Sequence, residues 1–348
     1  DAEQPIPMAG VPYHAADGYL VRLIAKGFRV AICEQMEPPS PGKKIVRREI
    51  TRIITPGTAT DANMLRSREN NYLAAVLRKG NRAGLAYVDV STGEFRSTEL
   101  PLEEIAPQLE SLNVREVLAA TGVEWAGVRT RTDLEAWIFD TDYASRTLRE
   151  HFSLLSLDGC GLGDKPLATG AAGAVLHYLR DTQRSALGHL DRPTYFDRNE
   201  AMVLDAVTVR NLELIEPLFA GESKESTLVH VLDETMTGMG GRLLRRRLLR
   251  PSVRRAEIEA RLDAVQALLA DTILRTELRK VLGSILDLER LLAKVTLGTA
   301  TPREMSALGN SLGKIPALNR LIGEVRFDEV AEVRDRILTT IADDPPLN

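Results

Sequence analysis

The first 60 residues combine one helical pattern with two extended ones. Apolar residues gather on one face of a helix predicted over 14–27, which ends on a glycine suited to a left-handed conformation. Alternation at 28–32 predicts a strand, and a breaker run at 37–42 separates it from a second strand over 46–54. We therefore expect a small α/β unit at the start of the chain.

The alternation in the second strand is imperfect. Val46, Ile50 and Ile54 share one parity, but Arg48 and Arg52 share it too. The other parity also mixes charged and apolar residues. Because strand side chains alternate with a period of two, this pattern does not settle which face is buried.

Closely spaced strands follow from about residue 70. Strands are predicted at 72–77, 84–90 and 94–98. The last two show alternating apolar and polar residues on either side of a glycine-containing turn at 91–93, which predicts a β-hairpin. The other elements predicted here are a helix at 102–112, a strand at 116–119, a helix carrying Leu148, Phe152 and Leu155, and a close-packed helix from Ala168 to about Arg184. We expect one α/β domain with a mixed sheet over 70–192.

Beyond Pro193 the pattern is almost wholly helical, apart from a strand-like run at 202–204. Thr301 and Glu304 predict a helix start with a capping box, with proline at the first helical position. Three amphipathic helices are marked by Ile258, Leu262, Val265 and Leu269, by Leu274, Leu278, Val281 and Leu282, and by Leu288, Leu291, Leu292 and Val295. We expect a helical bundle or a long-helix lever over 193–348, whose apolar stripe is exposed if the bundle is incomplete.

Composition limits the class of protein. The 348 residues are 44% hydrophobic and 27% charged, which is typical of a globular chain with two or three domains. The net charge of -4 gives no overall attraction to nucleic acid, so a DNA contact needs a local basic patch. Cys33 and Cys160 lack metal or disulfide spacing, and no apolar run could span a bilayer. We expect a cytoplasmic protein without a membrane partner, truncated at both ends because it begins on Asp1 and ends on a Pro-Pro-Leu-Asn tail.

One local basic patch lies around the second strand. Ten residues of the sequence contain five positive charges and only one acid, Glu49. The basic residues are Lys43, Lys44, Arg47, Arg48 and Arg52. Such a run is able to bind phosphates from a strand. The alternative is a solvated surface, which is the commoner meaning of a charge run.

A second basic run accompanies a broad apolar stripe on a predicted helix. It consists of Arg242, Arg245, Arg246, Arg247, Arg250, Arg254 and Arg255. These arginines spread around much of the helix. We therefore favour ion pairs that brace neighbouring acidic helices over a DNA contact.

Asp89 lies beside the predicted hairpin turn, where a nuclease of the RNase H-like type carries its first metal-binding carboxylate. Two-metal chemistry needs several converging carboxylates. No convincing second and third carboxylate can be picked out, and Glu94 follows the turn with no clear role. We favour a turn-associated Asp89 and keep the metal-dependent nuclease as an alternative. The sequence contains no P-loop, dinucleotide-binding or nucleophile-elbow motif, and its histidines lack metal-ligand spacing.

Several blocks of this sequence are distinctive. They are PIPMAGVPYH at 5–14, VAICEQ at 30–35, RIITPGT at 52–58, DTQR at 181–184, residues 204–214 and residues 239–251. These blocks resemble the MutS family of DNA mismatch-recognition proteins: the first is similar to a loop of the family's mismatch-binding domain, and the next two follow it at matching intervals. The resemblance covers essentially the whole chain.

The resemblance implies a multidomain α/β plus all-α fold. Residues 1–60 would be the remaining part of the mismatch-binding domain, 61–69 a linker, 70–192 an RNase H-like connector without nuclease activity, and 193–348 the first part of a helical lever or core domain. It also implies a homodimer that binds double-stranded DNA with mispaired or looped bases and signals to a MutL-type repair factor. The family's ATPase domain, with its ATP and Mg²⁺, would lie beyond this chain, so we expect no catalytic site and no cofactor here.

Site residues follow from the same resemblance. Arg48 matches a basic position of the family's DNA-facing domain and is our first candidate, followed by Arg52, Lys43 and Lys44, with Met8 in the opening loop. The family's Phe-x-Glu wedge would lie upstream of Asp1, so discrimination of mismatches is expected to be poor. A paralogue that binds recombination intermediates is a further alternative, but such paralogues typically lack the mismatch-binding domain.

Overall fold

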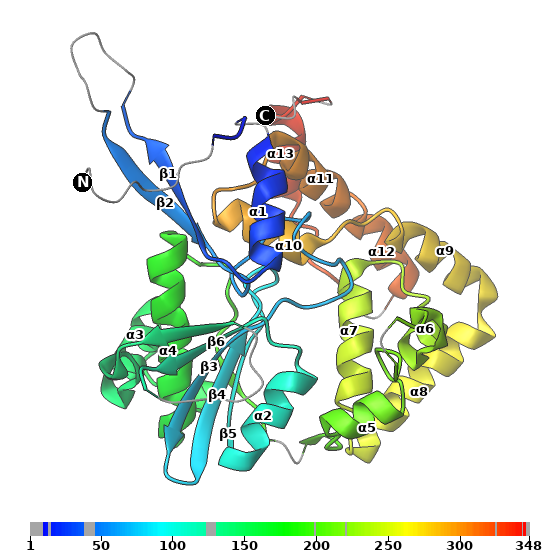
Figure 1. Cartoon of the computed structure of the whole chain (residues 1–348). Coiled ribbons are helices and arrows are strands. Elements are labelled where there is room, and N and C mark those ends of the chain that lie inside the picture. The colour runs from blue at the N-terminus through cyan, green and yellow to red at the C-terminus, as the bar shows by residue number, and fades with distance from the viewer. Residues whose placement is uncertain are drawn as a thin grey trace.

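The computed structural model describes residues 10–12, 15–37, 46–122, 130–197, 200–219, 221–323, 326–342 and 344–345. Figure 1 shows a two-stranded ribbon and a helix at the N-terminal end, a sheet flanked by helices, and a large helical region. This arrangement confirms the expected α/β plus helical class.

The N-terminal unit consists of α1 (Ala16–Ala25) and the antiparallel strands β1 (Val30–Gln35) and β2 (Arg48–Ile54). Its small core contains Ile24 and Ile54, against which Val30 and Ile32 pack. The inner end of the ribbon is therefore buried, while its outer end, with Gln35 opposite Arg48, projects away from the sheet and the helices (Figure 1).

A β-bulge explains the imperfect alternation in β2. Ile32 pairs with Arg52 but the next residue, Cys33, pairs with Ile50, so Thr51 is an extra residue in the ladder. Because an extra residue reverses the alternation, Arg48 and Arg52 lie on opposite faces of the ribbon despite their shared parity in sequence.

The central sheet has six strands in the order β7-β6-β3-β4-β5-β8. Strands β3, β4 and β5 form an antiparallel meander, whereas β6 runs parallel to β3, β7 parallel to β6 and β8 parallel to β5. Their bounds are Leu73–Lys79, Arg82–Val88, Phe95–Pro101, Glu116–Ala120, Arg131–Leu134 and Thr194–Tyr195. The predicted hairpin and mixed sheet are thus confirmed, whereas the sequence pattern did not predict the strands β7 and β8.

Helices cover both faces of this sheet. The long helix α4 (Pro166–Gln183) packs on one face with α3 (Thr141–Phe152) outside it, and α2 (Leu102–Ser111) covers the other. Small residues permit the close packing, since a Cβ on Gly173 would lie 2.3 Å from that of Ala144. Leu155, expected on the helix before α4, instead follows α3 and is 99% exposed. Short 3₁₀ helices occupy Ala136–Phe139, Asp158–Cys160 and Lys224–Ser226.

The helical region contains nine of the α-helices in the described part of the chain. They are α5 (Ala206–Asn211), α6 (Leu228–Leu232), α7 (Gly238–Leu249), α8 (Arg255–Ala270), α9 (Thr272–Leu282), α10 (Leu288–Thr296), α11 (Pro302–Leu312), α12 (Ile315–Ile322) and α13 (Ala331–Thr340). The capping box at Thr301 is confirmed, because its hydroxyl accepts from the Glu304 amide while the Glu304 carboxylate accepts from the Thr301 amide.

Two sequence predictions in this region are wrong. Residues 202–204 form no strand; only the adjacent Ala201 makes an isolated bridge, to Ser252. The arginine-rich helix ends at Leu249, so Arg254 and Arg255 belong to the start of α8 instead. A proline at 251 explains the break, since it cannot donate the hydrogen bond that would continue the helix.

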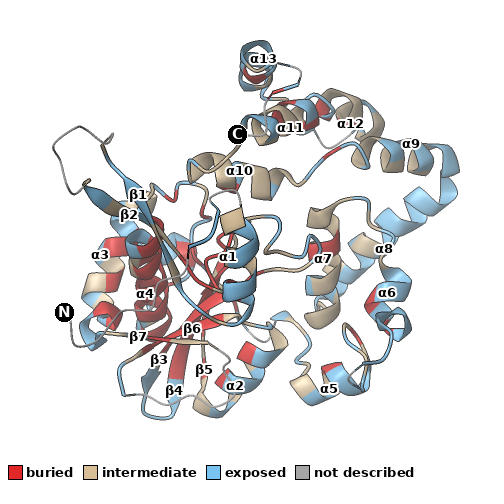
Figure 2. Ribbon diagram, turned by 45° about the horizontal axis from the view of Figure 1, so that its top comes forward, coloured by how far each residue is buried: buried red, intermediate tan, exposed pale blue. Residues whose placement is uncertain are grey.

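The apolar stripe of α8 is exposed. Ile258, Leu262, Val265 and Leu269 are 39%, 61%, 63% and 70% exposed, and α8 has no buried residue. Figure 2 shows α8 and much of α9 in the colour of exposed residues. The predicted apolar stripe of α8 therefore lies at the surface of the described structure. In the described part of the chain, no helix is both long and apolar enough to cross a membrane.

Candidate functional site

The bulge places the two ribbon arginines in different surroundings. Arg48 is exposed at the outer end of β2. Arg52 is 19% exposed and forms an ion pair of 2.9 Å with Asp61, on the face that packs toward α1. Arg47 pairs with Glu49. Lys43, Lys44 and Met8 lie outside the described residues.

The ribbon is also attached to the sheet unit through the end of α4. Arg184, in a left-handed conformation at the C-terminal cap, donates from Nη1 to the Ile50 carbonyl at 2.5 Å. The side chain of Gln183 donates to the Ile53 carbonyl at 3.4 Å. Both residues belong to the DTQR block, and no local pattern in that block predicted a contact with the ribbon.

Asp89 is fully buried, and hydrogen bonds occupy both of its carboxylate oxygens. Oδ1 accepts from the amide and hydroxyl of Ser91 at 2.9 and 2.7 Å, and Oδ2 accepts from Asn70 Nδ2 and the Asn71 amide at 2.9 and 3.1 Å. These contacts confirm the turn-associated interpretation. No group of three or more potential metal ligands occurs among the described residues, so nothing supports the nuclease alternative.

Glu94 links the sheet unit to the helical region. Its Oε2 accepts from the Tyr72 hydroxyl at 2.9 Å, while Oε1 pairs with Arg246 of α7 at 3.1 Å. Burial, followed by the negative charge of Glu94, raises the pKa of Tyr72 well above its usual range. The role that the sequence could not assign to Glu94 is therefore a contact between units.

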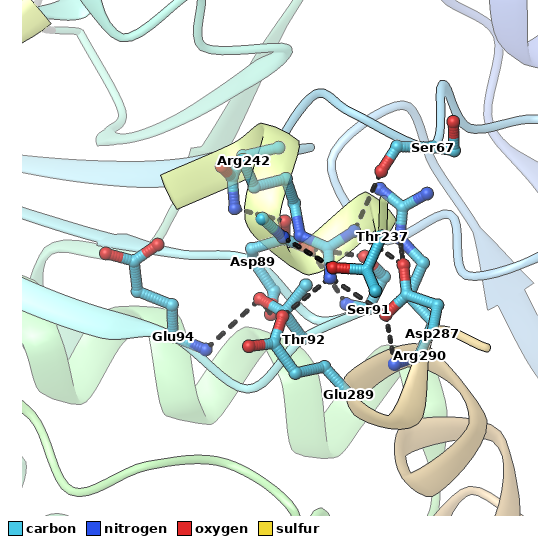
Figure 3. Close-up of polar contacts among 12 residues, drawn as sticks. Ser67, Asp89, Ser91, Thr92, Glu94, Thr237, Arg242, Asp287, Glu289 and Arg290 are labelled. Atoms are coloured by element: carbon cyan, nitrogen blue, oxygen red, sulfur yellow. Dashed lines mark hydrogen bonds and ion pairs between the residues drawn. The ribbon is translucent and has the colours of Figure 1, made fainter. Parts of the chain in front are cut away.

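Arg242 is the most buried arginine of α7, with a side chain only 4% exposed (Figure 3). Its guanidinium binds both carboxylate oxygens of Asp287 at 2.6 and 2.8 Å and Glu289 at 2.6 Å, and it donates to the Ser67 carbonyl at 2.9 Å. Burial alone would lower the pKa of Arg242, but the hydrogen bonds that its guanidinium donates to Asp287 and Glu289 outweigh burial and raise that pKa. The expected bracing of acidic elements by this helix is confirmed at Arg242.

Arg290 of α10 and Arg68 extend the same network. Arg290 donates to the carbonyls of Arg66 and Glu69 at 3.0 and 2.8 Å. Arg68 pairs with Asp233 at 2.9 Å and donates to the Thr235 carbonyl at 3.1 Å. Burial, followed by the nearby charge of Arg242, lowers the pKa of Arg290. Residues 66–69 are thus bound on two sides by the helical region.

Comparison with known families identifies the three units in order. MutS domain I matches residues 1–63, MutS domain II matches 71–191 and MutS domain III matches 207–348. The chain therefore belongs to the MutS family, as its sequence blocks suggested.

Individual relatives are similar over nearly the whole chain. The DNA mismatch repair protein MutS of Solibacter usitatus is 63% identical over 99% of this chain and 42% of its own length. Those of Methanothrix thermoacetophila and Alkaliphilus oremlandii are 40% and 36% identical over the same share of this chain, and over 39% and 42% of their own lengths. The chain thus spans about two-fifths of the length of these relatives.

Proposed function

We propose that this chain contributes DNA binding and signal transmission to the recognition of mispaired or looped bases in DNA mismatch repair. The observation that carries the proposal is the ordered match to MutS domains I, II and III, together with the similarity to relatives that are named DNA mismatch repair protein MutS. On this proposal the ribbon unit contacts the duplex, and the other two units connect it to distant parts of the protein.

The sheet order supports an RNase H-like class for the connector. An antiparallel meander of β5, β4 and β3 continues into the parallel strands β6 and β7, which is the strand arrangement we associate with that fold. Its buried Asp89 is committed to backbone and side-chain donors, which fits a connector without nuclease chemistry. We propose that the helical region is the first part of the lever.

Arg48 is the strongest candidate for a phosphate contact. It is exposed at the outer end of the ribbon, which projects away from the sheet and the helices (Figure 1), and no ion pair to an acid competes for it among the described residues. Arg52 is held by Asp61 and would have to leave that carboxylate to contact DNA. We therefore rank Arg48 before Arg52, and keep Lys43, Lys44 and Met8 as proposals from sequence alone.

The remaining roles belong to the proposal for the whole protein. We infer a homodimer that signals to a MutL-type repair factor, located in the cytoplasm on the nucleoid. ATP and Mg²⁺ would act in an ATPase domain of that protein. This chain contains no P-loop sequence, so its residues do not fit an ATP site and no step is assigned to nucleotide here.

Fluorescence anisotropy with matched and G·T-mismatched duplexes tests the proposal. We expect weak binding, with a dissociation constant on the order of 10 to 100 μM, because phosphate contacts supply nearly all of it and the net charge is negative. Arg48→Ala should weaken binding to both duplexes equally and lower the slope of log affinity against log salt by about 1. Arg255→Ala, which removes an 89% exposed arginine of α8, is the matched control.

The outcomes separate the alternatives. Equal loss in Arg48→Ala and none in Arg255→Ala would support the ribbon as the DNA contact. Binding that survives Arg48→Ala unchanged would move the contact elsewhere and contradict our ranking. A clear preference for the mismatch would mean that residues present in this chain, such as Met8, read the lesion.

A further inference from the structure

We propose that α7 and α10 determine the path of the 61–69 linker, and that Gly241 and Arg242 are thereby positioning residues for the DNA-contacting ribbon. The inference that these residues affect DNA binding rests on the proposed function of the ribbon. The inference that the helical region determines the position of the ribbon relative to the sheet rests only on the contacts of α7 and α10 with the linker.

The helical region binds the main chain of the linker. Carbonyls of three linker residues accept hydrogen bonds from two arginines, with Arg290 bridging Arg66 and Glu69 and Arg242 binding Ser67 between them. Because a guanidinium presents its donors in a fixed planar fork, two of them can specify the course of a short backbone segment.

Arg242 is itself held in place. Asp287 binds it through two parallel hydrogen bonds and Glu289 adds a third, so the donor aimed at Ser67 has little freedom to turn away. A lysine at this position would keep the charge but not the fork, and it could not satisfy both carboxylates and the carbonyl in the same geometry.

Glycines bring the linker against the backbone of α7. A Cβ on Gly241 would lie 2.7 Å from Cγ of Arg68, and one on Gly238 would lie 2.9 Å from the Ser67 carbonyl oxygen. Any side chain at Gly241 would therefore push the linker outward. This contact explains why the Met-Gly-Gly-Arg block is glycine-rich where ordinary helices favour other residues.

Both ends of the linker are tied to other units. At one end, Asp61 pairs with Arg52 of the ribbon and lies 3.8 Å from Lys294 of α10. At the other, Asn70 and Asn71 donate to Asp89 of the sheet unit. A shift of α7 against α10 would thus be transmitted through one short segment to the ribbon. The competing determinants are the direct contacts between the ribbon unit and the sheet unit, in which Arg184 and Gln183 donate to ribbon carbonyls and Glu116 accepts from the Gly57 amide. These contacts would fix the ribbon without the linker.

Energy transfer between two dyes separates these possibilities. Cys33 on the ribbon is exposed and Cys160 is buried, so one dye can be attached to Cys33 and the other to Leu155→Cys, at a 99% exposed position of the sheet unit. We expect Gly241→Ala and Arg242→Lys to shift or broaden the transfer distribution. Gly159→Ala, where a Cβ meets nothing within 4 Å, and Arg255→Lys are the matched controls.

Hydrogen exchange gives a second reading on the same variants. The amides of Met64, Leu65 and Glu69 are hydrogen-bonded within linker turns, and we expect their exchange to accelerate about tenfold or more while β3–β5 stay protected. Arg68→Ala tests the contact from the linker side in case Gly241→Ala fails to fold. Unchanged transfer and unchanged linker exchange in folded Arg242→Lys and Arg68→Ala would overturn the proposal and leave the direct contacts between the ribbon unit and the sheet unit as the determinants.

DNA affinity keeps this test distinct from that of the proposed function. If Arg48→Ala leaves DNA binding intact, the ribbon is not the DNA contact, but the transfer and exchange results still decide whether the linker is held by α7 and α10. If Arg48→Ala abolishes binding, Arg242→Lys should weaken it several-fold without altering the salt slope, since no phosphate contact is removed. An unaltered affinity in that case would refute the positioning role.

Discussion

At the scale of single residues, Glu116 joins three segments that lie far apart in the sequence, and no sequence motif predicted this role. This fully buried carboxylate accepts hydrogen bonds from the Gly57 amide at 3.1 Å, from Thr132 at 2.5 Å and from Tyr178 at 2.7 Å. It thereby attaches the Thr-Pro-Gly-Thr turn to the central sheet. The turn was recognisable in sequence as a family block, but its partner lies 59 residues away and has no local signature.

Replacing this carboxylate tests its contribution. In Glu116→Gln, the new side-chain NH₂ group would face one of the three groups that now donate to the carboxylate. Two donors would then oppose each other, so we expect a loss of about 1–3 kcal/mol in the free energy of unfolding. Urea denaturation measures the loss, with Glu110→Gln on the exposed side of α2 as control. A loss no larger than that of the control would mean that the hydroxyls reorient without cost.

Three partly buried histidines make stability depend on pH. Burial is the largest cause that lowers the pKa of His151, His177 and His189 below the usual value. His189 is the clearest case, because Nε2 is hydrogen-bonded to the Val90 carbonyl at 2.8 Å and the buried Nδ1 has no partner for an added proton among the residues that the structure describes.

The direction of the pH dependence follows because the pKa values of these histidines are lower in the folded chain than in the unfolded chain. The unfolded chain takes up these protons at a higher pH than the folded chain, so acidification favours unfolding. We expect the free energy of unfolding to fall between about pH 7.5 and about pH 5.5, and His189→Gln to reduce that fall. Urea titrations at both pH values measure it, and a flat profile in the wild-type chain would contradict the assignment.

At the scale of elements, sequence pattern predicted what is strongly periodic and failed where one residue breaks the period. The hairpin, the mixed sheet and the capping box followed from local chemistry. The faces of β2 did not, because the extra residue Thr51 reverses the alternation and only the pairing with β1 reveals it. Strand β8 has only two residues, too few for any periodicity, and exists because β5 offers it an edge.

The exposed stripe of α8 leads to a prediction at this scale. Leu262→Lys combined with Val265→Lys should change the free energy of unfolding by no more than about 0.5 kcal/mol, since neither side chain is packed. Self-association in sedimentation velocity should decrease because the apolar surface shrinks. Leu148→Ala in the core of the sheet unit is the comparison and should cost about 2–5 kcal/mol. A comparable loss in the α8 variant would show that the stripe is packed after all.

At the scale of the whole molecule, local sequence could name Arg48 and Arg242 but not what they touch. Arg242 and Ser67 are 175 residues apart, and Ser67 contributes a main-chain oxygen that any residue would provide. Burial also distinguishes the two basic runs: the exposed Arg48 is free to meet a ligand, while the buried Arg242 is committed to the interior. The number of charges does not distinguish the two runs in this way, because it contains no information about burial.

The hydrogen bonds onto the carbonyls of Arg66, Ser67 and Glu69 have a consequence for how this segment can change over time. Every amino acid carries such a carbonyl, so most substitutions at Ser67 would leave the partner of Arg242 in place. Removing or inserting one residue would instead displace the three carbonyl oxygens from the guanidinium groups of Arg242 and Arg290. We therefore expect related proteins to differ in the amino acids of residues 66–69 while keeping the length of this segment.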